Sequence, residues 1–424
     1  MRRFGFFILS LLLSGVLLQA QETKVQQYLE LIAAQEPFRS SSLGVLAVRA
    51  NGDTLANFGS RAKLVPASNM KLITTGLALD NLGPGYRYAT VLACDGEVRD
   101  SVLVGNLYLI GEGDPSLGVD MGTKDPELRN FRQWQEMLAS AGIARIEGNL
   151  IADRRYFTEE GILGDWMAED LESEDAVAAA GVNFRHNYRD TTYAGGATRS
   201  GAAHLAHYFG EYLASAGLAV EGETGDEAEF AALLAPEDSL HYLGRTYSEP
   251  LRALVKHTNH RSDNLFAEVM FRTLGKELRE NDGYSSCAAV ETTLLEEMGL
   301  PMSGVRVRDG SGLSRKDYVS PEFMTGFLLK MIGRPVFDDF VRSLPQPGAG
   351  TLAARMRTAP ASLKSRIYMK SGSMDGVRCF SGYVLPLSGK PEDVIAFSVM
   401  TNNNTAPSGT VLPILDRIIL LIAE

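Results

Sequence analysis

A serine and a lysine stand three residues apart at Ser68 and Lys71, directly after Pro66 and at the start of an apolar segment. This segment, residues 68–82, is rich in Leu, Ile, Thr and Ala and ends before Gly83, which predicts a buried helix. Residues three apart share one face of a helix, so the lysine amine can reach the serine hydroxyl. The pair predicts an activated serine nucleophile, and the fold must bring the remaining catalytic groups to it.

The second motif is Ser262-Asp263-Asn264. Acyl transfer needs a nucleophile, a proton acceptor, a proton donor to the leaving amine and donors for the oxyanion. We assign Ser68 as the nucleophile and Lys71 as the acceptor, provided that burial and neighbouring cations lower the pKa of the lysine. Ser262 would pass the proton to the departing amine, and Asn264 would hold both Lys71 and a substrate amide.

The third motif is Lys370-Ser371-Gly372, on a predicted strand at 368–372. Lys370 would add positive charge beside the nucleophile, and the Ser371 hydroxyl suits a substrate carboxylate. Gly372 would let a substrate backbone lie against the edge of the strand. The oxyanion donors would be the backbone amides of Ser68 and Ser373.

Each motif has a plainer interpretation when it is taken alone. Ser-x-x-Lys recurs by chance, Ser-Asp-Asn is a common helix cap or turn, and Lys-Ser-Gly suits an ordinary strand end. Their order within one exported chain favours the catalytic interpretation. A Ser-His-Asp triad is the competing site, but the sequence has no Gly-x-Ser-x-Gly elbow.

The chain starts with two arginines and an apolar run from Phe4 to Leu18, which predicts a secretory signal over residues 1–20. An uncleaved anchor is the alternative. Removal of this signal leaves 39 basic and 52 acidic residues, a formal charge of −13. Such an acidic product has little reason to bind nucleic acid, and no later apolar run has membrane length. We predict an exported, periplasmic protein with no integral span after signal removal.

The cysteines and histidines predict neither a disulfide scaffold nor a metal centre. Cys94, Cys287 and Cys379 allow at most one pair, and Cys379 falls in an apolar strand pattern typical of a buried small residue. His257 and His260 can share a helix face, but no third ligand is suitably spaced in the sequence. We therefore predict no cofactor and no metal.

The two ends of the chain are predicted to build one domain. Residues 43–50 and 54–58 are predicted as strands on either side of the Asn51-Gly52 hairpin turn, and strands are also expected at 368–372, 377–385 and 394–401. These five strands can form one antiparallel sheet, flanked by helices at 24–34 and 411–423. We predict an α/β (α+β) fold with a discontinuous catalytic domain, residues 21–84 and 249–424, and an inserted β-rich domain at 85–248.

The chain resembles the D-alanyl-D-alanine carboxypeptidases and endopeptidases of the penicillin-binding protein 4 type, the low-molecular-mass class C penicillin-binding proteins. Beyond the three motifs, the resemblance extends over nearly the whole mature chain and includes four segments: Pro66-Ala67-Ser68-Asn69-Met70-Lys71, Gly111-Glu112-Gly113-Asp114-Pro115-Ser116-Leu117, Arg261-Ser262-Asp263-Asn264-Leu265 and Asp309-Gly310-Ser311-Gly312-Leu313-Ser314-Arg315. The resemblance implies that residues 309–315 lie near the active-site cleft. Residues 111–117 are expected to be structural, as part of its wall.

The resemblance also implies a penicillin-binding, β-lactamase-like serine transpeptidase fold. Its implied substrates are peptidoglycan stem peptides with D-alanyl bonds, and β-lactams would acylate the same serine. Two departures stand out. Ser68 and Ser262 are 194 positions apart, an interval shorter than in large family members, so a third small domain is expected to be reduced or missing. Ser371 replaces the usual threonine but keeps the hydroxyl.

The sequence thus predicts a serine DD-carboxypeptidase, DD-endopeptidase or both, acting through an acyl-enzyme on Ser68. Two alternatives remain at this point. A β-lactamase or esterase would use the same serine but admit water faster, and a wall-binding protein would keep the fold without turnover. The oligomeric state is left open.

Overall fold

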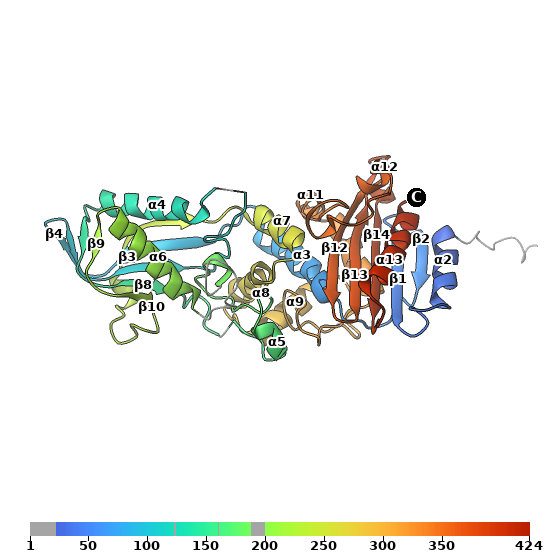
Figure 1. Ribbon diagram of the computed structural model, residues 1–424, viewed down its shortest axis with the longest axis horizontal. Coiled ribbons are helices and arrows are strands. Elements are labelled where there is room, and N and C mark those ends of the chain that lie inside the picture. The colour runs from blue at the N-terminus through green and yellow to red at the C-terminus, as the bar shows by residue number, and fades with distance from the viewer. Residues whose placement is uncertain (1–22, 123, 160, 188–199) are drawn as a thin grey trace, which may run out of the picture.

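The computed structural model describes residues 23–122, 124–159, 161–187 and 200–424. The molecule is elongated, with a five-stranded sheet at one end, two further sheets at the other, and helices α3, α7, α8 and α9 between them (Figure 1). The predicted signal, residues 1–20, lies outside the described residues. Among the described helices, none has the length and apolar character needed to cross a bilayer.

The two ends of the chain form a single antiparallel sheet, as predicted. Its strand order is β12-β13-β14-β1-β2. The N-terminal part contributes β1 (Ser42–Arg49) and β2 (Thr54–Phe58), and the C-terminal part contributes β12 (Ile367–Met374), β13 (Val377–Val384) and β14 (Ile395–Asn402). Because β1 pairs with β14 along its whole length, from Ser42 opposite Asn402 to Arg49 opposite Ile395, the two termini belong to one unit.

Helices cover both faces of this sheet, which explains why every residue of β14 is buried. Helices α2 (Lys24–Ala33) and α13 (Ser408–Ala423) share one hydrophobic cluster with one face of the strands. The opposite face joins the main cluster with the helices α3 (Met70–Leu82), α8 (Asn264–Arg279), α9 (Tyr284–Glu297) and α10 (Pro321–Ile332). Shorter helices complete this part: α7 (Leu251–Arg261), α11 (Phe337–Arg342) and α12 (Ala361–Lys364).

The predicted insertion holds the other two sheets. The larger has the order β10-β8-β6-β3-β11 and the smaller β4-β5-β7-β9. Their strands are β3 (Ala89–Cys94), β4 (Glu97–Arg99), β5 (Val102–Val104), β6 (Leu107–Gly111), β7 (Arg145–Ile146), β8 (Leu150–Asp153), β9 (Ala219–Val220), β10 (Thr224–Asp226) and β11 (His241–Tyr247). The helices of this part are α4 (Pro126–Ser140), α5 (Ala168–Leu171) and α6 (Gly201–Ser215).

The strand-like stretches 101–110 and 145–151 are each divided between the two sheets. In both stretches a Gly-Asn-Leu fragment, starting at Gly105 or at Gly148, lies where the chain passes from the smaller sheet to the larger one. The two fragments lie side by side, because the Gly148 amide donates to the Gly105 carbonyl at 3.1 Å and Leu107 pairs with Leu150 in parallel register. The matching fragments therefore have equivalent places in the fold, which their short length did not predict.

Part of the predicted insertion packs on the catalytic helices. Leu163, Trp166 and Val177 belong to the same hydrophobic cluster as helices α3 and α8. Buried Arg272 on α8 donates to the carbonyl of Ala179 and pairs with the Asp282 carboxylate. The domain boundaries at 85 and 248 remain a prediction, since residues between them also build the main core.

All three cysteines are buried and free. Cys379 lies on β13, next to the strand that carries the third motif, and its side chain is fully buried as the apolar pattern predicts.

Candidate active site

The first motif lies at the junction of a short 3-10 turn, Ala67–Asn69, and helix α3. Ser68 is therefore in the turn, two residues before the regular helix begins at Met70, and not in the helix predicted over residues 68–82. Ala67 has a φ of 47°, a left-handed conformation that is unfavourable for alanine. Lys71 lies in the first turn of α3 and is fully buried, with its Nζ 3.0 Å from Ser68 Oγ. The spacing of three residues thus brings the two groups together as predicted.

Two groups from distant parts of the chain fix the Lys71 amine. Asn264 Oδ1 accepts from Lys71 Nζ at 2.6 Å, and the Ser311 carbonyl accepts at 2.8 Å. Burial lowers the pKa of Lys71 to about 8, although the carboxylates of Glu268 and Asp309 act in the opposite direction. The amine can therefore be neutral in mildly alkaline solution, as a proton acceptor must be.

The second and third motifs meet through Ser262 and Lys370. Ser262 ends helix α7 in a left-handed conformation with a φ of 60°, and Lys370 Nζ donates to its hydroxyl at 2.9 Å. Lys370 Nζ also donates to the Ser371 carbonyl at 2.8 Å. Burial, assisted by the nearby charge of Lys71, holds the pKa of Lys370 well below its usual value. The structure thus brings all three motifs together, through direct contacts to Ser68, Lys71, Ser262, Asn264 and Lys370.

The strand that carries the third motif, β12, is an edge strand of the main sheet. Ser371 Oγ donates to Thr351 Oγ1 at 2.9 Å, and Ser373 is exposed. A Cβ added to Gly372 would lie 2.5 Å from the carbonyl oxygen of Pro66. The structure therefore explains why position 372 needs a glycine, which the sequence did not reveal. The strand passes directly against the turn that carries Ser68.

The segment 309–315 contacts the turn that carries Ser68, near the site as the resemblance implies. Gly312 has a φ of 77°, and a Cβ there would collide with the carbonyl oxygen of Ala67. Buried Asp309 holds the loop, because it accepts from the amides of Gly312 at 2.6 Å and Ser314 at 2.7 Å. The carbonyl of Ser311 is consequently directed at Lys71.

Glu268 is a buried residue of the site that the sequence analysis missed. Its carboxyl group accepts from the amides of Gly310 at 3.2 Å and Ser311 at 2.7 Å, and burial raises its pKa to about 8. Glu268 follows Asn264 by one helical turn on α8, so both face the Lys71 region. That spacing was the signal available in the sequence.

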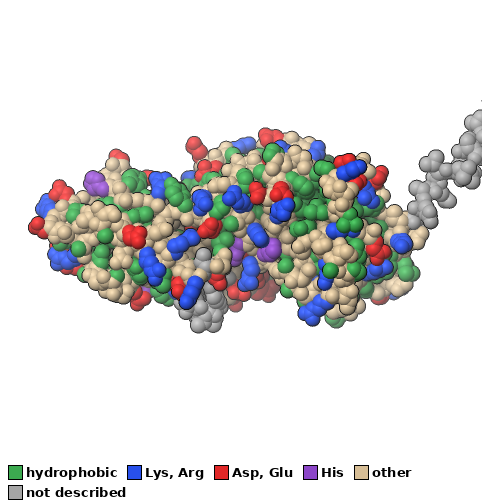
Figure 2. All heavy atoms as spheres, turned by 90° about the horizontal axis from the view of Figure 1, so that it is seen from above, with side chains coloured by type: hydrophobic (Ala, Val, Ile, Leu, Met, Phe, Trp, Pro, Cys, Tyr) green, Lys and Arg blue, Asp and Glu red, His purple; other side chains and the backbone are tan. Residues whose placement is uncertain are grey.

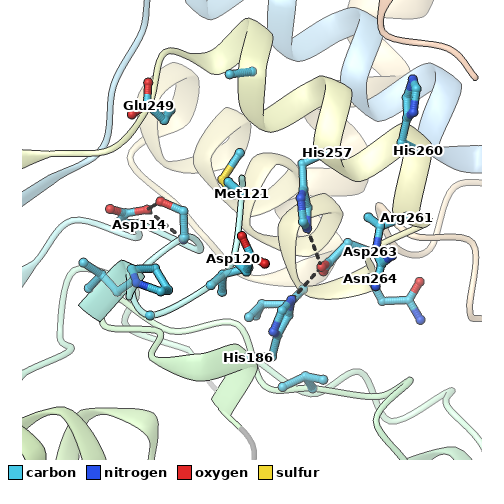
Figure 3. A pocket seen from close by; sticks show the side chains of 18 of the residues that line it. Asp114, Asp120, Met121, His186, Glu249, His257, His260, Arg261, Asp263 and Asn264 are labelled. Atoms are coloured by element: carbon cyan, nitrogen blue, oxygen red, sulfur yellow. Dashed lines mark hydrogen bonds and ion pairs between the residues drawn. The ribbon is translucent and has the colours of Figure 1, made fainter. Parts of the chain in front are cut away.

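A cavity of about 950 Å³ lies beside the second motif, and Ser262, Asp263 and Asn264 belong to its lining. Figure 3 shows His186 and His257 directed at Asp263 from opposite sides. Although burial alone would raise the pKa of Asp263, hydrogen bonds from the two histidines hold it below its usual value. Asp114, Ser116 and Leu117 also line this cavity, but Ser68, Lys71 and Lys370 do not, so the place of residues 111–117 in the wall of the active-site cleft stays a prediction. Figure 2 shows histidine and basic side chains at mid-length of the molecule.

Comparison with known proteins identifies the family. The profile of the D-Ala-D-Ala carboxypeptidase 3 (S13) family matches residues 25–195 and 187–412. The chain belongs to this family. It is 26% identical to a D-alanyl-D-alanine carboxypeptidase of Actinomadura sp. (strain R39), over 96% of this chain and 85% of the relative. This S13 member is therefore an enzyme of the serine-type D-Ala-D-Ala carboxypeptidase class.

Solved structures confirm the predicted fold of the S13 chain. Penicillin-binding protein 4 (dacB) of Haemophilus influenzae aligns with a TM-score of 0.73 at 20% identity, over 90% of this chain and 95% of that one. A predatory endopeptidase of Bdellovibrio bacteriovorus, solved in a penicillin G acylated form, aligns with a TM-score of 0.54 at 18% identity, over 90% and 91% of the two chains. At these identities the structural likeness supports the fold alone.

Proposed function

We propose that the protein hydrolyses D-alanyl peptide bonds of peptidoglycan stem peptides through an acyl-enzyme on Ser68. The observation that carries this proposal is the 3.0 Å contact between Ser68 Oγ and the buried Lys71 Nζ. A neutral amine at this position can take the hydroxyl proton as the oxygen attacks. Motifs two and three then supply the remaining groups.

In the first half-reaction, Ser68 Oγ attacks the carbonyl carbon of the scissile D-alanyl bond and Lys71 Nζ accepts the hydroxyl proton. The backbone amides of Ser68 and Ser373 stabilise the oxyanion. Ser262 then relays a proton to the departing amine, either of free D-alanine or of a cross-link. The 2.9 Å bond from Lys370 Nζ orients the Ser262 hydroxyl for this step.

The edge of β12 binds the substrate chain. The Met369 amide of this strand already donates to the Pro345 carbonyl at 3.1 Å. Beyond that point, at Ser371 and Ser373, the edge can pair with an extended peptide, as edge strands do in peptide recognition. The Ser371 hydroxyl and the charge of Lys370 receive the terminal carboxylate, while Asn264 binds a substrate amide. Water hydrolyses the resulting ester, with Lys71 now activating the water and returning the proton to Ser68.

A fluorescent penicillin tests the acyl-enzyme directly. The purified mature chain should form a stoichiometric covalent adduct, which peptide mass mapping should place on Ser68. Ser68→Ala should form none, whereas Ser362→Ala, an exposed serine on α12, should label like the wild type. A folded wild-type sample that stays unlabelled would refute the proposal.

Measurements of turnover distinguish the proposed peptidase from a β-lactamase or a wall-binding protein with the same fold. Sustained hydrolysis of a β-lactam over many cycles would favour a β-lactamase. Binding of glycan that is indifferent to Ser68→Ala, without release of D-alanine, would favour a wall-binding protein. A digest of purified peptidoglycan, analysed for free D-alanine and for split cross-links, measures the balance of carboxypeptidase and endopeptidase action.

We also propose export to the periplasm with cleavage after Ala20, supported by the basic start and short apolar run of the sequence. The bacterial relatives named above are consistent with a wall substrate. N-terminal sequencing of the protein from its native cells tests the cleavage, and a chain that still begins at Met1 would contradict it.

A further inference from the structure

Three side chains that take no part in the proposed reaction converge beside the second motif. His186 Nε2 lies 2.7 Å from Asp263 Oδ2, and His257 Nε2 lies 3.3 Å from the same oxygen. The three atoms all lie within 4.8 Å of one another. They come from the 3-10 turn Arg185–Asn187, from helix α7 and from the N-cap of α8 (Figure 3).

We propose that His186, His257 and Asp263 form a binding site for a divalent cation of the zinc class. Two imidazole nitrogens and one carboxylate oxygen are ligands that Zn²⁺ accepts. Bonds of about 2.0–2.2 Å at tetrahedral angles place neighbouring ligand atoms about 3.4 Å apart. The His257 separation matches this spacing, and His186 needs a movement of under about 1 Å.

The cavity gives the ion access and room for further ligands. All three residues line it. The described residues of the lining include six with carboxylate side chains and only three lysines or arginines. This excess of negative charge favours a cation. Besides Asp263, the acidic residues of the lining are Asp114, Asp120, Glu174, Asp175 and Glu249. Sites with three protein ligands keep a position for water or substrate, and here that position opens into the cavity.

The backbone around His186 is unusual in a way that suits a ligand site. Arg185, His186 and Asn187 have φ values of 48°, 57° and 56°, three consecutive left-handed residues without a glycine. The Asn187 side chain holds this turn, because its Oδ1 accepts from the Phe184 amide at 2.9 Å and its Nδ2 donates to the Ala178 carbonyl at 2.8 Å. Strain of this kind persists where the surroundings enforce it, often at functional sites.

The other two ligands are equally fixed. The His257 ring stacks on Phe266 with centroids 4.5 Å apart. Asp263 uses Oδ1 to accept from the Phe266 amide at 3.2 Å as the N-cap of α8, so Oδ2 is the oxygen directed at both histidines. Preorganised ligands of this kind lower the cost of binding an ion.

The site is adjacent to the catalytic machinery but distinct from it. Asp263 lies between Ser262 and Asn264, and Asn264 Oδ1 contacts Lys71 Nζ at 2.6 Å. An ion here would therefore join the turn Arg185–Asn187, within the predicted insertion, to the helix start that positions Asn264. The cation site does not depend on the proposed peptidase mechanism, and zinc binding tests it separately.

The experiment uses the mature wild-type chain, stripped with a chelator and dialysed. Calorimetric titration with Zn²⁺ should show one ion per chain, and Co²⁺ should give the visible absorption bands of a tetrahedral site. Changes in outer-shell residues weaken metal sites by about 10–100-fold, so loss of a ligand in His257→Ala should weaken zinc binding by more than about 100-fold. His260→Ala is the matched control, since His260 lines the same cavity outside the cluster and should bind normally.

His186→Gln distinguishes a metal site from a purely hydrogen-bonded cluster. The glutamine amide can still donate to Asp263 but is a poor zinc ligand, so the fold should survive while zinc affinity falls. Circular dichroism and thermal unfolding check that the variant is folded, and wild type and His260→Ala, but not His186→Gln, should gain thermal stability with Zn²⁺. Absence of zinc binding in wild type, or wild-type affinity in folded His186→Gln, would overturn the proposal.

Discussion

Gly372 lies so close to Pro66 that a Cβ on the glycine would be 2.5 Å from the proline carbonyl oxygen. The obstacle is backbone, so it cannot rotate away. We predict that Gly372→Ala displaces the turn that carries Ser68, and a misplacement of about 1 Å can cost about 100-fold in rate. The rate of labelling by a fluorescent penicillin measures the effect.

The control for this substitution is Gly409→Ala on α13, where an added Cβ meets nothing within 4 Å. It should label at the wild-type rate. Unchanged labelling of Gly372→Ala would show that the strand yields without moving Ser68.

The rate of acylation should depend on the protonation of Lys71. Because burial lowers the pKa of Lys71 to about 8, the neutral amine predominates above that pH, and the acylation rate should rise through about pH 8 to a plateau. In its ionised form Glu268 favours the ammonium form of Lys71, and although burial raises the pKa of Glu268, its ionised fraction grows over the same pH range; Glu268→Gln removes this charge. The pH range over which the acylation rate rises should therefore move to lower pH.

A pH profile of penicillin acylation for wild type and Glu268→Gln makes this measurement. Glu296→Gln, an exposed glutamate on α9, is the control and should leave this pH range in place. A range that stays put or moves to higher pH in Glu268→Gln would show that Glu268 does not set the charge state of Lys71.

Buried Glu291 should make stability fall as the solution becomes alkaline. Burial raises its pKa from 4.5 to about 8, so between these values the folded state holds a proton that the unfolded state has released. The contribution of Glu291 to the free energy of unfolding is therefore fully present below about pH 4.5 and is lost as the pH rises through about 8. Glu291→Gln cannot ionise, and between about pH 6 and 9 it should lose less stability than wild type, by on the order of 2 kcal/mol.

Urea unfolding at several pH values tests this difference, with the exposed Glu297→Gln on the same helix as control. Parallel pH dependence of wild type and Glu291→Gln would mean that Glu291 titrates normally.

The serine at position 371 should act through its hydroxyl. Ser371 Oγ is held by Thr351 at the edge of β12, where the terminal carboxylate is proposed to bind. Ser371→Ala should reduce kcat/KM for a D-Ala-D-Ala peptide by about 10- to 150-fold, since a hydrogen bond to a charged group contributes about 1.5–3 kcal/mol. Ser371→Thr, which restores the usual hydroxyl residue, should remain close to wild type.

Steady-state kinetics with a D-Ala-D-Ala peptide checks both variants, and an ester substrate without the terminal carboxylate provides the internal comparison. The ester should be hydrolysed equally by wild type and Ser371→Ala. Equal losses on both substrates would assign Ser371 to the chemical step instead of carboxylate binding.

Much of the main sheet could be predicted because its signals are local. Short apolar runs on either side of the Asn51-Gly52 turn predict β1 and β2, and similar apolar runs predict β12, β13 and β14. The splitting of residues 101–110 was not predictable from periodicity, since Gly105 redirects the chain only because a second strand crossing lies against it. Which sheet a strand joins depends on contacts between residues that are far apart in the sequence.

The sequence by itself determined the contact between Ser68 and Lys71, because a spacing of three residues is enough to place them on one face. It also identified Ser262, Asn264 and Lys370 by motif. Only the tertiary structure decided what surrounds them: Glu268 accepts from the Ser311 amide, and His186 contacts Asp263 from 77 residues away. Burial and contacts between distant segments set the charge states and the ligand geometry, and neither is encoded in any short stretch of the chain.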